Sequence, residues 1–134
     1  MRTLTRYLGD TYAFIEAFTG HPRYGRILRA GGVVTTSLNV LELHYSLLRV
    51  RVPPEEAEKY SRATLRLAIE VPSEVAMAAA KTRFSMNEKF RGAGLEQRIS
   101  YIDAWGYEAA RALERPFLTG DPAFKGVPGV SFVT

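Results

Sequence analysis

Short apolar runs alternate along the chain with longer segments in which apolar residues recur at helical spacing. The short runs are β-branched or aromatic and predict strands at residues 6–9, 33–36, 69–71, 117–119 and 130–133. The longer segments predict helices at residues 11–18, 22–30, 37–50, 55–68, 73–88 and 103–114. Residues 89–98 are basic, contain two glycines and predict a loop. This alternation favours an α/β fold, a three-layer α/β/α sandwich with a central, mostly parallel sheet.

The composition narrows the class of protein further. A chain of 134 residues with 46% hydrophobic and 24% charged residues predicts a single soluble domain, residues 1–134. No apolar run reaches the ~18 residues of a membrane span, and the first residues lack a signal peptide, so we expect a cytoplasmic location without membrane association. The absence of cysteine excludes disulfides, thiolate zinc sites and cysteine nucleophiles.

The basic residues indicate a nucleic-acid partner. The net charge is +4, and most of the basic residues are arginine, which suits bidentate contact with phosphate. The low content of Asn and Gln leaves heat adaptation as a second explanation. We hypothesise that the densest basic stretch contacts the RNA backbone, although a solvated charged face explains it equally well: Lys81, Arg83, Lys89, Arg91 and Arg98.

The chain has only three aspartates, and each follows a strand-like run. They are Asp10, Asp103 and Asp121. Functional groups collect at the carboxyl ends of strands in open α/β sheets. Carboxylates gathered there repel one another unless a cation lies between them, so a metal site is the leading hypothesis. The alternative for each is a local role as a helix cap or a turn residue.

Glu42 is a fourth acidic candidate. It lies on a narrow polar stripe of the predicted helix 37–50, together with Asn39, Ser46 and Arg49. The rest of that helix is apolar, which predicts that it is largely buried. A carboxylate on its polar stripe then faces a cleft or an arginine partner.

Four carboxylates suit Mg²⁺ or Mn²⁺, which prefer oxygen ligands. Such a metal activates a water and neutralises charge on a phosphoryl oxygen, so the set favours phosphodiester hydrolysis. Thr119, two residues before Asp121, is placed to orient a ligand or a metal-bound water.

Read in order, these segments resemble a PIN-domain ribonuclease over nearly the whole chain. The motifs are Tyr7-Leu8-Gly9-Asp10-Thr11, Thr36-Ser37-x4-Glu42-Leu43, Ser100-Tyr101-Ile102-Asp103-Ala104, Phe117-Leu118-Thr119-Gly120-Asp121 and the terminal Val130-Ser131-Phe132-Val133. One departure is Gly9, where the family usually has a bulky apolar residue.

The subgroup that the chain resembles most is the VapC-like toxins of toxin–antitoxin pairs. The resemblance implies an Mg²⁺- or Mn²⁺-dependent endoribonuclease that leaves a 5′-phosphate, forms a homodimer and is inhibited by a small antitoxin protein. It implies that Asp10, Glu42, Asp103 and Asp121 bind metal and act in catalysis, with Thr119 in support.

Other functions stay open at this stage. An RNA-processing PIN nuclease outside any toxin–antitoxin pair, and a non-catalytic module that docks a partner on helices 38–50 and 55–68, both fit the pattern. A phosphoacceptor domain fits less well because no lysine motif accompanies the aspartates. Trp105 and Tyr107 suit base stacking, or packing in the core or a dimer. His44, within an apolar helix, suits a core position.

Overall fold

The computed structural model describes residues 7–134 and has a parallel sheet at its centre. The strands lie in the order β2-β1-β3-β4, and every pairing is parallel. Their bounds are β1 Tyr7–Gly9, β2 Val33–Val34, β3 Phe117–Thr119 and β4 Val130–Phe132. The predicted strand at 6–9 therefore begins at Tyr7 among the described residues, since residue 6 lies outside them. The predicted sandwich is confirmed, with a sheet that is parallel throughout.

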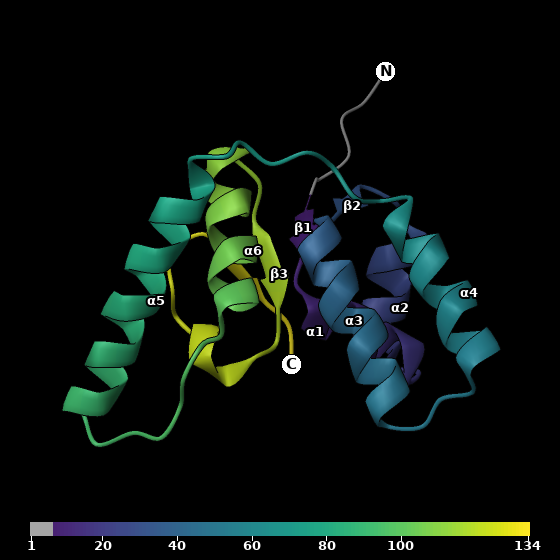
Figure 1. Cartoon of the computed structure of the whole chain (residues 1–134), viewed down its shortest axis with the longest axis horizontal. Coiled ribbons are helices and arrows are strands. Elements are labelled where there is room, and N and C mark those ends of the chain that lie inside the picture. The colour runs from purple at the N-terminus through teal and green to yellow at the C-terminus, as the bar shows by residue number, and fades with distance from the viewer. Residues whose placement is uncertain (1–6) are drawn as a thin grey trace.

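Helices cover both faces of this sheet. Figure 1 shows α5 and α6 on one side of β1 and β3, and α1, α2, α3 and α4 on the other. The helix bounds are α1 Thr11–Phe18, α2 Pro22–Arg29, α3 Ser37–Arg49, α4 Pro54–Leu65, α5 Val75–Gly92 and α6 Tyr101–Ala112, with a short 3₁₀ helix η1 at Pro122–Phe124. Within residues 7–134, none of these helices combines the length and the apolar character needed to cross a bilayer.

The central strands separate two hydrophobic cores. Successive side chains of a strand point to opposite faces. Leu8 and Phe117 accordingly pack with residues of α5 and α6, whereas Leu118 packs with residues of α1, α3 and α4. All three side chains are completely buried. The residues that follow β1 and β3 are thereby fixed at the carboxyl edge of the sheet.

Two predicted elements are wrong. Residues 69–71 form no strand, because the chain makes a single bridge between Ala68 and Thr35 and then leaves the sheet. Residues 89–98 are not one loop, because α5 continues to Gly92 and carries Lys89 and Arg91 on the helix. Helix-forming residues extend it past the predicted end, and Gly94, with a φ of 74°, provides the left-handed turn that stops it.

Gly9, the departure from the family pattern, lies where the interior has no room for a side chain. A Cβ at this position would be 2.8 Å from Cε2 of Phe14 and 3.1 Å from Cγ1 of Val33. Phe14 is only 2% exposed, so its ring fills the space that a larger residue would occupy. The glycine therefore allows β1 and α1 to pack closely at this position.

We predict that Gly9→Ala lowers the free energy of unfolding by about 1–3 kcal/mol, because overpacking forces the Phe14 ring to move. Chemical denaturation of the two proteins measures the difference. Gly9→Ala combined with Phe14→Leu is expected to lose less than the sum of the two single substitutions. Strict additivity in this double-mutant cycle would contradict the account.

Candidate acidic site

The pairing of β1 with β3 brings Asp10 beside Thr119. Gly9 is in register with Leu118, and the backbone N–H of Asp10 donates to the Leu118 carbonyl at 2.9 Å. The next residues of the two strands are therefore neighbours. The Thr119 hydroxyl donates to Oδ2 of Asp10 at 2.7 Å, and both residues are buried. Thr119 thus orients the Asp10 carboxylate.

Asp103 begins helix α6 as part of a capping box. Its Oδ2 accepts from the backbone N–H of Ser100 at 2.7 Å, and the Ser100 hydroxyl accepts from the backbone N–H of Asp103 at 3.1 Å. The local role considered from the sequence is therefore real. It uses one carboxylate oxygen, and the hydrogen bonds within residues 7–134 leave Oδ1 for other contacts.

Asp121 makes a comparable arrangement after β3. Its Oδ1 accepts from the backbone N–H of Ala123 at 3.0 Å and starts the 3₁₀ helix η1. Its own backbone N–H donates to the Thr119 hydroxyl at 3.1 Å, so one threonine positions two aspartates. Asp10 occupies the N-cap position of α1, but its side chain makes no capping hydrogen bond.

Glu42 reaches the same region from α3. Within residues 7–134 it forms no ion pair, so the arginine partner considered from the sequence is not observed. Ser46, one turn later, lines the same cavity, whereas Arg49 is exposed. The prediction that this helix is largely buried is wrong: α4 covers one side only, and Leu41 and Tyr45 are 59% and 63% exposed.

All four acids line one cavity of about 290 Å³ at the carboxyl edge of the sheet. The other lining residues are Thr11, Tyr12, Ile15, Ser46 and Ser100. The acids come from positions 10, 42, 103 and 121, which the parallel strands and the two flanking helices bring together. Such an arrangement concentrates negative charge in a partly enclosed space.

Burial and mutual repulsion change the acidity of two members of this set. Burial, followed by the negative charge of Asp103, raises the pKa of Asp10 well above its ordinary value, although the Thr119 hydrogen bond opposes this. Burial raises the pKa of Asp103 to about 6, with smaller contributions from Glu42 and Asp121. Both carboxylates would therefore gain from a neighbouring positive charge.

The chemistry of the site fits a hard divalent cation. Every donor is a carboxylate or hydroxyl oxygen, and Oδ1 of Asp10 is buried without a hydrogen-bond partner among the described residues. Across residues 7–134, no three His, Cys, Asp or Glu side chains already stand at the spacing of a metal site. The acids thus share a cavity without forming a preassembled metal site among the described residues.

A buried polar network beside the acids was not anticipated from the sequence. Thr36 donates its hydroxyl hydrogen to Oδ1 of Asn39 at 2.7 Å, and Nδ2 of Asn39 donates to the Thr11 hydroxyl at 3.1 Å. Asn39 is only 1% exposed. Its position on the polar stripe with Glu42 was the available signal, but the stripe alone did not separate a buried asparagine from a cavity-lining glutamate.

We predict that, in buffer containing EDTA, the free energy of unfolding falls as pH rises from about 4 to 7. Between the ordinary pKa and the raised pKa of Asp103, the native state binds more protons than the unfolded state. Asp103→Asn keeps an oxygen that accepts from the Ser100 N–H but removes the titrating carboxyl. The decrease in unfolding free energy between pH 4 and 7 should therefore be smaller in this variant, by on the order of 1–3 kcal/mol. Chemical denaturation across this pH range measures the unfolding free energy of both proteins.

Glu96→Gln, in an exposed loop, serves as the control, and identical profiles for Asp103→Asn and the unmodified protein would contradict the prediction.

The fold of this chain is shared with known proteins. A family model described as PIN domain matches residues 7–130. Similar solved structures include a toxin–antitoxin complex from Klebsiella pneumoniae, with a TM-score of 0.69, 18% identity and coverage of 93% of this chain and 95% of that chain. VapBC2 from Rickettsia felis bound to a promoter DNA fragment has a TM-score of 0.68 and 18% identity, and the match covers 96% of this chain and 98% of that chain. DNA-bound VapBC from Salmonella typhimurium has a TM-score of 0.68 and 15% identity, and the match covers 97% of this chain and 98% of that chain.

These identities are low, so the structures show a shared fold, and no curated protein matches the sequence significantly. The family model covers most of the chain, including all four acids. The chain therefore belongs to the PIN domain family.

Proposed function

We propose that this protein is a metal-dependent endoribonuclease that hydrolyses RNA phosphodiester bonds. The observation that carries the proposal is the cavity lined by Asp10, Glu42, Asp103 and Asp121, in which a buried oxygen of Asp10 has no partner among the described residues. These four residues would bind Mg²⁺ or Mn²⁺. When bound, the ion activates a water and neutralises charge on the phosphoryl group.

The protein's own residues prepare the carboxylates for this task. Thr119 restrains Asp10 through its hydroxyl and Asp121 through the backbone N–H of that residue. Ser100 restrains Asp103 at the start of α6. Each side chain is thereby presented to the cavity in a defined orientation, which limits the rearrangement needed when the ion and the substrate bind.

We propose further that the protein is the toxin of a toxin–antitoxin pair. The support is the similarity in fold to structures whose titles name such complexes. The partner would be a small antitoxin protein that blocks the acidic cavity. Nuclease activity in RNA processing, outside such a pair, uses the same site and differs only in the partner.

A homodimer is the assembly that we propose. Four apolar side chains form an exposed stripe along α3, at successive spacings of three and four residues: Leu38, Leu41, Tyr45 and Leu48. A second copy of the chain would cover this stripe, since monomeric proteins rarely leave such a surface uncovered.

The second candidate function is a non-catalytic binding module. It is favoured by one observation, that no three of the acids within residues 7–134 already stand at metal-site spacing. On this reading the apolar helix surfaces dock a partner and the acidic cavity does no chemistry.

We predict that Asp10→Asn and Asp103→Asn each reduce RNA cleavage at least a hundredfold, because each removes a charge that holds the metal. The asparagines keep the size of the side chains and the hydrogen bonds to Thr119 and Ser100, so circular dichroism should show an intact fold. Cleavage of a labelled RNA with added Mn²⁺ measures the loss. Retention of activity in both variants would refute the proposed site.

Calorimetric titration with Mn²⁺ separates the two candidate functions. The nuclease is expected to bind the ion, to lose binding in Asp10→Asn and to cleave RNA. A protein that binds no Mn²⁺ and cleaves no RNA would favour the binding module.

We predict that Arg98→Ala lowers the salt dependence of RNA binding. Arg98 lies two residues before Ser100, which lines the acidic cavity. Loss of one phosphate contact reduces the slope of log K against log salt by about 0.7 for single-stranded RNA. Arg98 also donates to the Leu95 carbonyl at 2.8 Å, so the substitution disturbs a loop as well. The salt dependence distinguishes the two effects, because a disturbed loop weakens RNA binding without changing the slope of log K against log salt.

Arg62→Ala is the matched control, since Arg62 forms an exposed ion pair with Glu58 on α4. Its slope should equal that of the unmodified protein. Equal slopes for Arg98→Ala and the unmodified protein would remove Arg98 from the RNA contact.

A further inference from the structure

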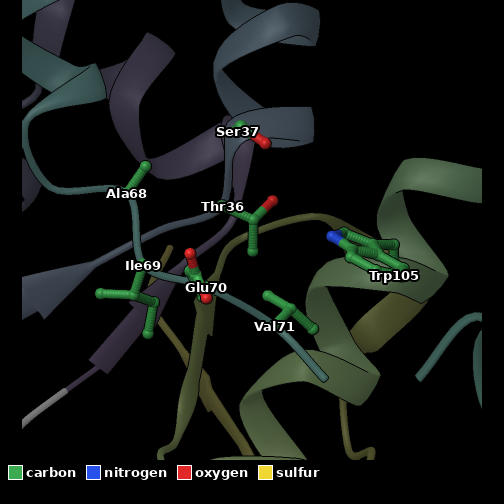
Figure 2. Close-up of a pocket in the computed structure, with 7 residues that line it drawn as sticks. All are labelled: Thr36, Ser37, Ala68, Ile69, Glu70, Val71 and Trp105. Atoms are coloured by element: carbon green, nitrogen blue, oxygen red, sulfur yellow. The ribbon is translucent and has the colours of Figure 1, made fainter. Parts of the chain in front are cut away.

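A second cavity lies near the acidic one and takes no part in the proposed chemistry. It has a volume of about 390 Å³ and is bounded by the start of α3, the segment 68–71 and the first turns of α6. Figure 2 shows the residues that surround it, among them Thr36, Ser37, Glu70, Val71 and Trp105. Its size is at the lower end for ligand sites, which suits one base better than a length of chain.

Trp105 gives this cavity an aromatic wall and an unused donor. The side chain is partly buried against the α5–α6 core and partly open. Its indole Nε1 is buried and has no hydrogen-bond partner among the described residues. Figure 2 shows this nitrogen at the end of the ring turned toward Thr36. A ligand with an acceptor beside the ring would satisfy the N–H, which otherwise costs free energy.

Glu70 gives the cavity a hydrogen-bond acceptor, in contrast to the donor on Trp105. It is exposed and forms no ion pair within residues 7–134. An ionised carboxylate only accepts hydrogen bonds, through two adjacent oxygens. It therefore selects a ligand edge with neighbouring N–H groups and disfavours a phosphate.

Asn39 connects this cavity to the acids. It is hydrogen-bonded to Thr36, which lines the second cavity, and to Thr11, which lines the acidic one. Along α3, Ser37 of the second cavity precedes Glu42 by five residues, a rise of about 8 Å. A nucleotide next to the scissile phosphate spans a distance of this order.

We propose that this cavity is a base-recognition subsite that binds a guanine of the RNA strand beside the scissile phosphate. The O6 of the base accepts from the indole N–H of Trp105, and its N1–H and N2 amino group donate to Glu70. Among the four RNA bases, guanine alone presents two adjacent donors to a carboxylate beside an acceptor. The role in RNA cleavage rests on the proposed ribonuclease function.

Nuclear magnetic resonance provides a direct test, because Trp105 is the only tryptophan in the chain and gives a single indole N–H signal. The ¹⁵N-labelled protein in EDTA is titrated with guanosine, adenosine, cytidine and uridine, which carry no phosphate to be repelled by the acids. Guanosine is expected to shift the indole signal saturably, with an affinity about tenfold above that of the other nucleosides. Equal shifts for all four nucleosides, or none, would overturn the subsite.

Substitutions test whether Glu70 provides the selectivity for guanosine. Glu70→Gln is expected to weaken guanosine binding about tenfold, because it removes a charge-assisted pair of hydrogen bonds. Glu74→Gln, an exposed glutamate that does not line this cavity, should bind guanosine as the unmodified protein does. Unchanged guanosine affinity in Glu70→Gln would also overturn the assignment.

Cleavage of RNA oligonucleotides tests the link to the active site. The unmodified protein with Mn²⁺ should cleave a uridine oligomer faster when one guanine stands beside the cleavage point, and Glu70→Gln should lose this preference. Guanosine binding without any RNA cleavage would refute the proposed nuclease and leave the subsite standing. RNA cleavage without guanosine binding would refute the subsite and leave the proposed nuclease standing.

Discussion

The parallel pairing of β1 with β3 is the constraint on which the site depends. It joins residues that are 109 positions apart in the chain and sets Asp10 against Thr119. Because Thr119 also receives the backbone N–H of Asp121, a single pairing fixes two of the four acids. The buried Leu8 and Phe117 hold this register from one core, and Leu118 holds it from the other. A shift of one residue would turn these side chains to the wrong faces and separate the aspartate from the threonine.

Each aspartate divides its two oxygens between structure and the cavity. One oxygen accepts a hydrogen bond from Thr119, Ser100 or the N–H of Ala123. Within residues 7–134, those bonds leave the other oxygen without a hydrogen-bond partner. A local capping hydrogen bond and a place in the cavity are therefore compatible, since the hydrogen bond orients the side chain. The cost is the desolvation and repulsion that raise the pKa of Asp10 and Asp103.

Much of this arrangement could be predicted from the sequence. Helix 11–18 and strand 117–119 have the predicted bounds because their patterns are strong and their ends carry clear signals, Asp10 and Gly120. Segment 69–71 could not be excluded as a strand, since Ile69 and Val71 are apolar and the chain bridges to Thr35 at Ala68 before it leaves the sheet. Asp10 and Asp121 follow strands and Glu42 lies on a polar stripe, as the sequence predicts, but the run before Asp103 forms no strand, and Asp103 reaches the cavity from the first turn of α6. Which oxygens stay unpartnered, and the cavity beside Trp105, depend on side-chain orientations that no local pattern encodes.

The separation of the paired strands has a consequence for synthesis. Asp10 and Glu42 leave the ribosome well before Thr119 and Asp121 are made. Strand β1 lacks its partner β3 until then, so an unfinished polypeptide holds its acids apart. The cavity forms only after residue 121 has been made, so translation products that stop before β3 lack it.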